Sequence, residues 1–139
     1  MKRFAAILIA IVFACSCQGR MESVYGNMGM DLRNIKYTVV ESNEQWMPNG
    51  DGEFYARLSF SSASEEAIED FKRQMLDNGA KELPVADQPT ILLGRLEPYR
   101  EPFHKGYYII KLDSNDTRNY ELLIFDEDTE ESIIQIEVL

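Results

Sequence analysis

Three β-rich runs close the sequence, and the short spacers between them restrict the fold more than any other feature. The runs cover residues 107–112, 120–125 and 132–138. The spacers, 113–119 and 126–131, are polar and too short to hold the crossover helix that parallel neighbouring strands require. The last third of the chain is therefore predicted to form an antiparallel meander.

A second antiparallel pair is predicted earlier in the chain. A β-rich run over 34–46 comes first, and a run over 53–60 with regular apolar and polar alternation follows it. Between them, residues 47–52 contain an Asn-Gly step and an Asp-Gly step. Both steps tolerate positive φ, which tight hairpin turns need. The pattern indicates a hairpin in which one face of the second strand is buried.

One amphipathic helix is predicted between the two groups of strands. Its apolar residues recur at helical spacing, and they are Ala67, Ile68, Phe71 and Met75. Ser62 and Glu65 fit a capping box at its start, although Ser64 is an alternative N-cap. Asn78-Gly79 supplies a stop.

These elements predict an α+β fold with the order β-β-α-β-β-β. An antiparallel sheet of about five strands would carry the helix on one face. Residues 84–104 hold four of the five prolines, so irregular chain is expected there, and residues 90–93 fit a short strand or a helical turn equally well.

The first residues have the pattern of a secretory signal. Lys2-Arg3 precedes an apolar run over 4–13, which is shorter than the ~20 residues of a transmembrane helix. Val12-Phe13-Ala14-Cys15 resembles the lipobox of bacterial lipoproteins. That resemblance implies cleavage before Cys15 and acylation of its thiol, for example with palmitate. Because Phe13 is bulkier than usual for this motif, Cys17 is the alternative lipidation site.

The expected organisation has three parts. Residues 1–14 are the lipoprotein signal peptide, 15–32 the lipidated cysteine with a flexible tether, and 33–139 a single α+β domain. The domain also resembles small uncharacterised bacterial lipoproteins in short motifs that imply no activity. These motifs are Trp46-x-Pro48-x-Gly50-Asp51-Gly52, Leu83-Pro84 and Gly106-Tyr107-Tyr108. The expected location is the cell envelope, with the domain anchored to the inner or outer membrane and facing the periplasm or the exterior.

Acidity restricts the expected partners. The chain has 14 Lys and Arg against 24 Asp and Glu, a net charge of −10. Such a surface repels nucleic acids and anionic lipid headgroups. Residues 113–139 hold nine acidic residues and one basic residue, which favours a basic protein partner. Asp126, Asp128 and Glu130 are the candidate contacts, although simple solubility explains the same charges.

The sequence shows no motif that points to a metal site, a cofactor or catalysis. Asp126, Asp128 and Glu130 have the spacing of a calcium loop, but Glu131 occupies the position that must be glycine. His104 is the single histidine, and no serine motif accompanies it. Trp46, Tyr99 and Phe103 are candidate aromatic contacts for a partner, with burial in the core as the alternative.

The leading interpretation is a membrane-tethered binding or accessory module without enzymatic activity. Within this class, an inhibitor or immunity-type protein for a basic partner fits the acidic charge best. The alternative is a small envelope hydrolase that uses paired carboxylates, one of them with a raised pKa.

Overall fold

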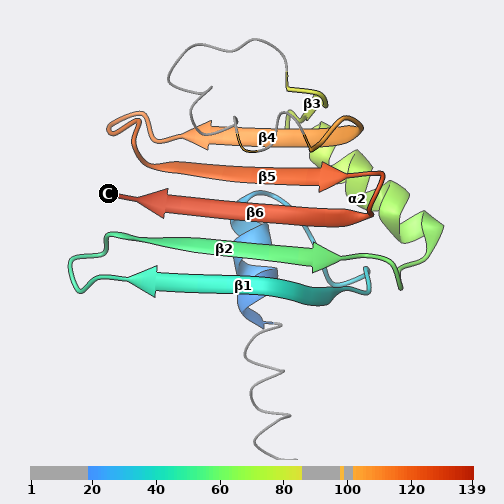
Figure 1. Ribbon diagram of the computed structural model, residues 1–139, viewed down its shortest axis with the longest axis horizontal. Coiled ribbons are helices and arrows are strands. Elements are labelled where there is room, and N and C mark those ends of the chain that lie inside the picture. The colour runs from blue at the N-terminus through green and yellow to red at the C-terminus, as the bar shows by residue number, and fades with distance from the viewer. Residues whose placement is uncertain (1–18, 86–97, 99–101) are drawn as a thin grey trace, which may run out of the picture.

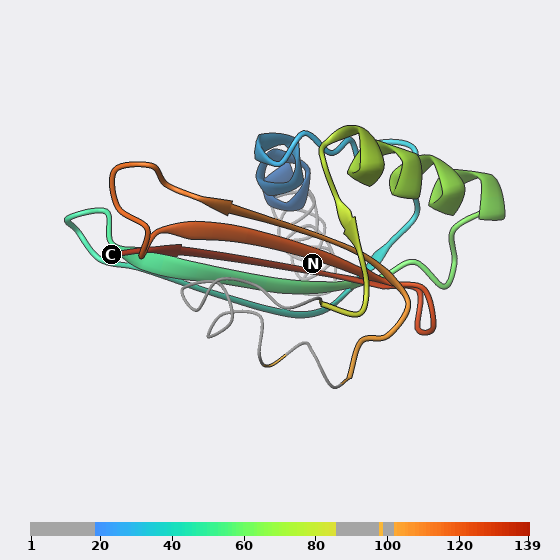
Figure 2. The ribbon, with the colours of Figure 1, turned by 90° about the horizontal axis from the view of Figure 1, so that it is seen from above.

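Among the residues that the structure describes, one antiparallel sheet of six strands forms the body of the protein, and two helices cover one of its faces (Figures 1 and 2). The computed structural model describes residues 19–85, 98 and 102–139. The strands lie side by side in the order β1-β2-β6-β5-β4-β3. Their bounds are Thr38–Trp46 (β1), Gly52–Ser59 (β2), Lys81–Glu82 (β3), Gly106–Leu112 (β4), Tyr120–Asp126 (β5) and Glu131–Val138 (β6).

The predicted first hairpin is confirmed. Gly50 has a φ of 94°, its N–H donates to the carbonyl of Met47, and the N–H of Met47 donates to the carbonyl of Asp51 at 2.7 Å. β1 pairs with β2 from this turn back to Thr38, with a register shift between Val39 and Glu41. β1 is thus an edge strand, since nothing in the described part of the sheet pairs with its outer side.

The predicted helix is confirmed as α2, Glu65–Asp77. Ser64 is its N-cap, and the Ser64 hydroxyl accepts a hydrogen bond from the N–H of Ala67 at 3.2 Å. The capping box that begins at Ser62 was therefore wrong, and the Ser64 alternative is confirmed. At the other end, Gly79 follows the Asn78 C-cap with a φ of 83°, as the stop signal predicted.

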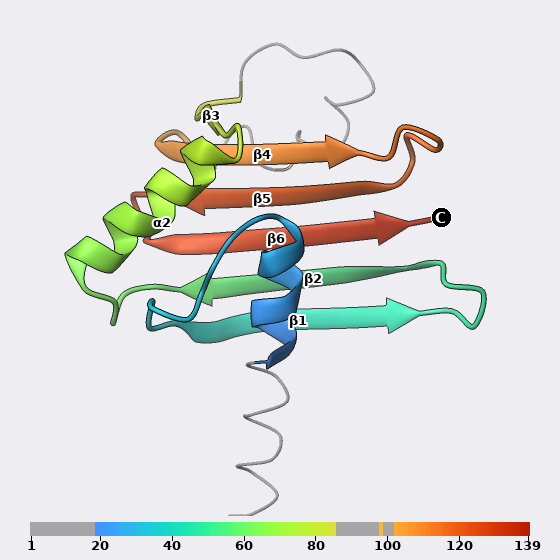
Figure 3. The same ribbon diagram turned by 180° about the vertical axis from the view of Figure 1, so that it is seen from behind.

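The predicted flexible tether is wrong for its described residues. Residues 19–27 are helical, and this N-terminal helix lies on the same face of the sheet as α2 (Figure 3). Several of its side chains and those just after it are fully buried in the main core: Met21, Val24, Tyr25, Met28, Met30 and Leu32. The Tyr25 hydroxyl also bonds the Ser132 hydroxyl of β6 at 2.7 Å. Hydrophobic burial of this kind holds the segment against the sheet.

Two apolar clusters pack on opposite faces of the sheet. The helix-covered face carries Phe60, Phe71 and Phe125, whose rings meet at centroid distances of 4.9 Å (Phe60–Phe71) and 5.6 Å (Phe71–Phe125). The second cluster contains Leu83, Val85, Tyr108, Tyr120, Leu122, Ile124 and Ile133. β5 contributes to both clusters, so it is buried on both sides.

The fold class was predicted correctly in outline, but the described residues form one more strand and one more helix than expected. The additional strand is β3, which pairs with β4 through Lys81 and Glu82. In the part of the chain that the structure describes, no helix is long and apolar enough to cross a membrane.

Candidate functional site

The candidate site is a hollow between α2 and the turn that joins β5 to β6, which we call the acidic hollow. Its volume is about 420 Å³. It is lined by Ser61, Ala63, Glu65, Ile68, Glu69, Lys72, Phe125, Glu127 and Glu130. Glu65 and Glu69 lie one helical turn apart on α2, and the strand order places the turn opposite them. Two acidic segments that are distant in sequence therefore share one surface.

Lys72 neutralises only part of this charge. Its ammonium pairs with Glu69 at 2.8 Å and with Glu127 at 3.2 Å, and Lys105 approaches the other oxygen of Glu127 at 3.4 Å. The hydrogen bond to Glu69 is the main reason why the pKa of Lys72 is raised, with a further contribution from Glu127. No ion pair among the described residues involves Glu65 or Glu130, so these two carboxylates remain open to a cation.

The turn itself corrects part of the sequence prediction. Asp126 is only 3% exposed, and its carboxylate accepts hydrogen bonds from the N–H of Asp128 at 3.2 Å and the hydroxyl of Thr129 at 2.6 Å. Asp126 therefore holds the turn in shape and was wrongly predicted to contact a partner. Asp128 and Glu130 are exposed, and Glu130 has a φ of 54°.

Two of the three predicted aromatic contacts lie among the described residues, and their surroundings differ. Phe103 is partly buried and packs against the second cluster, so the core alternative holds for it. Trp46 is 41% exposed, and its indole N–H donates to Glu44 at 2.6 Å. Tyr99 lies outside the described residues, as do Cys15 and Cys17. His104 is exposed in the chain before β4.

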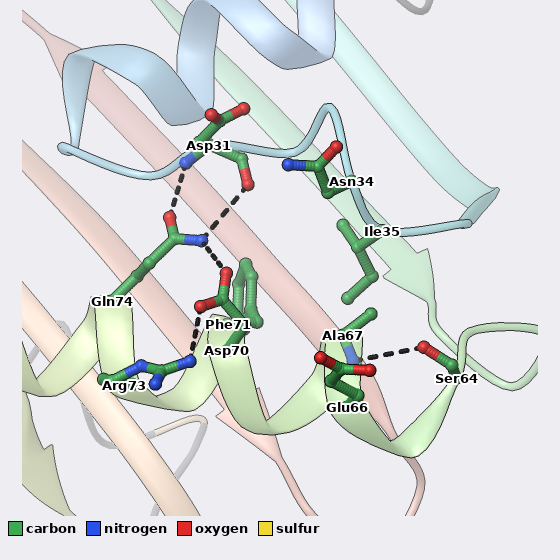
Figure 4. A pocket seen from close by; sticks show the side chains of 10 residues that line it. All are labelled: Asp31, Asn34, Ile35, Ser64, Glu66, Ala67, Asp70, Phe71, Arg73 and Gln74. Atoms are coloured by element: carbon green, nitrogen blue, oxygen red, sulfur yellow. Dashed lines mark hydrogen bonds and ion pairs between the residues drawn. The ribbon is translucent and has the colours of Figure 1, made fainter.

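A second hollow, of about 350 Å³, lies on the other flank of α2 beside residues 31–35 (Figure 4). Gln74 accepts a hydrogen bond from the N–H of Asp31 at 2.7 Å and donates to Asp70 at 2.9 Å. This hydrogen bond from Gln74, followed by that from Arg73, lowers the pKa of Asp70. Since most polar groups of this hollow bond one another, it is a junction that fastens the N-terminal segment to α2.

The described carboxyl groups with a displaced pKa lie outside the acidic hollow. Three described carboxyl groups, Asp31, Glu44 and Asp70, have a displaced pKa, and in each case it is lowered. The pKa of Asp31 falls to about 2, mainly because the Arg33 side chain bonds it. A general acid needs a displacement in the opposite direction. Over the described residues, no group of three or more His, Cys, Asp or Glu side chains is placed to hold a metal ion.

Sequence reasoning missed Glu65, Glu69 and Glu127 as members of the site. The i, i+4 spacing of Glu65 and Glu69 placed them on one face of the helix, but only the packing of α2 beside the β5–β6 turn shows which acids they join. Neither a family model, nor a curated protein, nor a solved structure matches the chain.

Proposed function

We propose that this chain is a lipid-anchored module of the bacterial cell envelope that binds a basic segment of a partner protein in the acidic hollow. The observation that carries the proposal is the pair of open carboxylates, Glu65 and Glu130, at a hollow that also contains apolar side chains. Ala63 and Ile68, both partly exposed, also line it. A lysine or arginine has the matching character, because its apolar stem and charged end can use both kinds of contact.

The charge of the whole chain supports this choice of partner. A net charge of −10 attracts basic proteins over several ångströms and speeds their association at low salt. An inhibitor or immunity-type role would follow if the bound segment belonged to the active surface of an enzyme or toxin. The proposed anchor is Cys15, with Cys17 as the alternative.

The binding proposal is tested by photo-cross-linking in cells that express the full chain. A photoreactive residue at Ser61, which lines the acidic hollow, should capture one basic protein. The same residue at Ser114, exposed in the β4–β5 loop, should not. The variant Glu65→Gln/Glu130→Gln should lose the cross-link, and the control Glu53→Gln/Glu82→Gln, which removes the same charge elsewhere, should keep it. Equal capture by both variant pairs would exclude the acidic hollow as the binding site.

The anchor is tested separately by labelling cells with a fatty acid that carries a chemical handle. Label should enter the full chain and disappear in Cys15→Ser. Loss in Cys17→Ser alone would move the anchor to the alternative cysteine, and label that survives both changes, or never enters, would reject the lipoprotein proposal.

A further inference from the structure

The outer edge of the sheet at β1 is the most exposed apolar feature of the described chain. Large hydrophobic side chains are exposed at five described positions, and three of these lie on β1 or directly after it: Val40 (46%), Trp46 (41%) and Met47 (64%). They are spread along one strand at the border of the sheet. This distribution suits contact with an extended flat surface better than a pocket for a small molecule.

The start of the described chain is fastened to the same edge. One oxygen of Glu44, Oε1, accepts hydrogen bonds from the Arg20 guanidinium and from the Trp46 indole. The Arg20 guanidinium also lies over the ring of Phe54, 5.4 Å from its centroid. The first turn of the N-terminal helix is thereby held beside β1 and Trp46. Figure 1 shows this helix beginning at the β1 side of the sheet and running toward β6.

A lipid on either cysteine would be held close to this edge. A chain extends by at most about 3.6 Å per residue, so Gly19 can lie no farther than about 7 Å from Cys17 or about 14 Å from Cys15. Because residues 19–27 are helical and packed into the core, they cannot serve as a long spacer. An acylated chain would therefore keep the β1 edge near the bilayer surface.

We propose that the β1 edge, with Val40, Trp46 and Met47, rests on the lipid bilayer and orients the anchored domain. The inference depends on the lipid anchor proposed above. Tryptophan favours the boundary between headgroups and acyl chains, where its ring is in apolar surroundings and its N–H stays bonded. The two acids of the middle of β1 are already paired, Glu41 with Arg57 at 3.9 Å and Glu44 with Arg20, which reduces repulsion from the surface.

This orientation leaves the acidic hollow open to a partner. α2 crosses the helix-covered face of the sheet from the end of β2 toward β4 and β3, away from β1 along its length (Figure 3). The hollow opens at the end of the sheet where β5 turns into β6. A partner approaching along the membrane or from above it would reach Glu65 and Glu130 without displacing the domain.

Trp46 is the single tryptophan of the chain, so its fluorescence reports this contact directly. The full acylated chain is reconstituted into vesicles of phosphatidylethanolamine and phosphatidylcholine, with or without bromine on the acyl chains near the headgroups. We expect Trp46 emission to be at least about two-fold weaker in the brominated vesicles. The matched control, Trp46→Phe/Leu76→Trp, moves the tryptophan to a position on α2 that is 48% exposed, and its emission should be the same in both vesicles.

Vesicle flotation separates this inference from the anchor itself. Protein that floats with vesicles but shows equal Trp46 emission in both lipids would overturn the docking of β1 while leaving the anchor in place. If the intensity of Trp46 emission is equal in both lipids but its maximum is shifted to the blue, another protein chain, such as a second copy, covers the edge. Protein that does not float would overturn both the anchor and the docking. Val40→Glu/Met47→Glu should float normally and lose most of the quenching.

Discussion

The phenol of Tyr25 and the hydroxyl of Ser132 form a hydrogen bond of 2.7 Å inside the core, joining the N-terminal helix to the central strand β6. Both side chains are fully buried, and the residues are 107 positions apart in sequence. This hydrogen bond links the helix to the sheet, and the sequence pattern did not predict it. It makes the helix part of the folded domain.

We expect Tyr25→Phe to lower the free energy of unfolding by about 1–2 kcal/mol, because it removes the bond and leaves the buried Ser132 hydroxyl without a partner. Ser132→Ala should cost a similar amount. The double variant should cost less than the sum of the two single changes, since each already breaks the same bond. Urea unfolding followed by Trp46 fluorescence measures all three. Strictly additive effects would mean that the two hydroxyls do not interact.

Tyr25 also predicts a loss of stability at high pH. Burial raises the pKa of its phenol well above the ordinary value of 10.0, which outweighs the lowering effect of the bond to Ser132. The folded protein therefore keeps this proton while the unfolded chain releases it above pH 10, so ionisation favours the unfolded chain. The stabilising contribution is complete below pH 10, and above it stability should fall by up to about 1.4 kcal/mol per pH unit.

The measurement is the slope of unfolding free energy against pH between 9.5 and about 11.5. Tyr25→Phe should have a shallower slope than the unmodified chain. Tyr107→Phe, which changes another partly buried tyrosine packed against the core, serves as a comparison. A slope that Tyr25→Phe leaves unchanged would show that another group causes the alkaline loss.

The five long strands and α2 could be predicted from sequence because their signals are local. The Asn-Gly and Asp-Gly steps, the apolar spacing along α2 and the short polar spacers each act within a few residues. The N-terminal helix was missed for the opposite reason. Its few apolar residues, Met21, Val24 and Tyr25, stand among glycine, serine and asparagine. Its helical state depends on packing against a sheet formed much later in the chain.

The second cluster and the acidic hollow depend on contacts between distant segments. The continuous apolar run of β5, Leu122 to Phe125, was a usable signal for a strand buried on both faces. The burial of Asp126 had no such signal, because an acidic residue in a polar spacer ordinarily faces water. Its position is set by the N–H of Asp128 and the Thr129 hydroxyl, which become neighbours only when the turn forms.

Gln74 is expected to be important for fastening residues 31–35 to α2. Gln74→Met keeps the side chain's length but cannot bond the N–H of Asp31 or the carboxylate of Asp70, and we expect a loss of about 1–2 kcal/mol in unfolding free energy. Arg73→Gln breaks only the exposed pair with Asp70 and should cost about 0.5 kcal/mol or less. If the two variants lost the same unfolding free energy, the hydrogen bonds of Gln74 would contribute no more to stability than the exposed ion pair of Arg73 with Asp70.

Two substitutions of Glu130 distinguish the effect of its carboxylate on partner binding from the effect of its backbone geometry on stability. Its φ of 54° lies in the left-handed region, where a side chain costs energy that glycine avoids. Glu130→Gly should therefore raise the unfolding free energy by up to about 1 kcal/mol, whereas Glu130→Ala keeps the unfavourable backbone geometry and should not. Both changes remove the same open carboxylate from the hollow.

Binding of the basic partner should consequently weaken to a similar degree in the two variants, although only one of them is stabilised. Affinity is measured with the captured partner at low and moderate salt, and both variants should show a smaller dependence on salt than the unmodified chain. Two results would show that the Glu130 carboxylate has no part in recognition. In the first, neither change alters the affinity for the partner. In the second, the affinities of the two variants follow the order of their unfolding free energies.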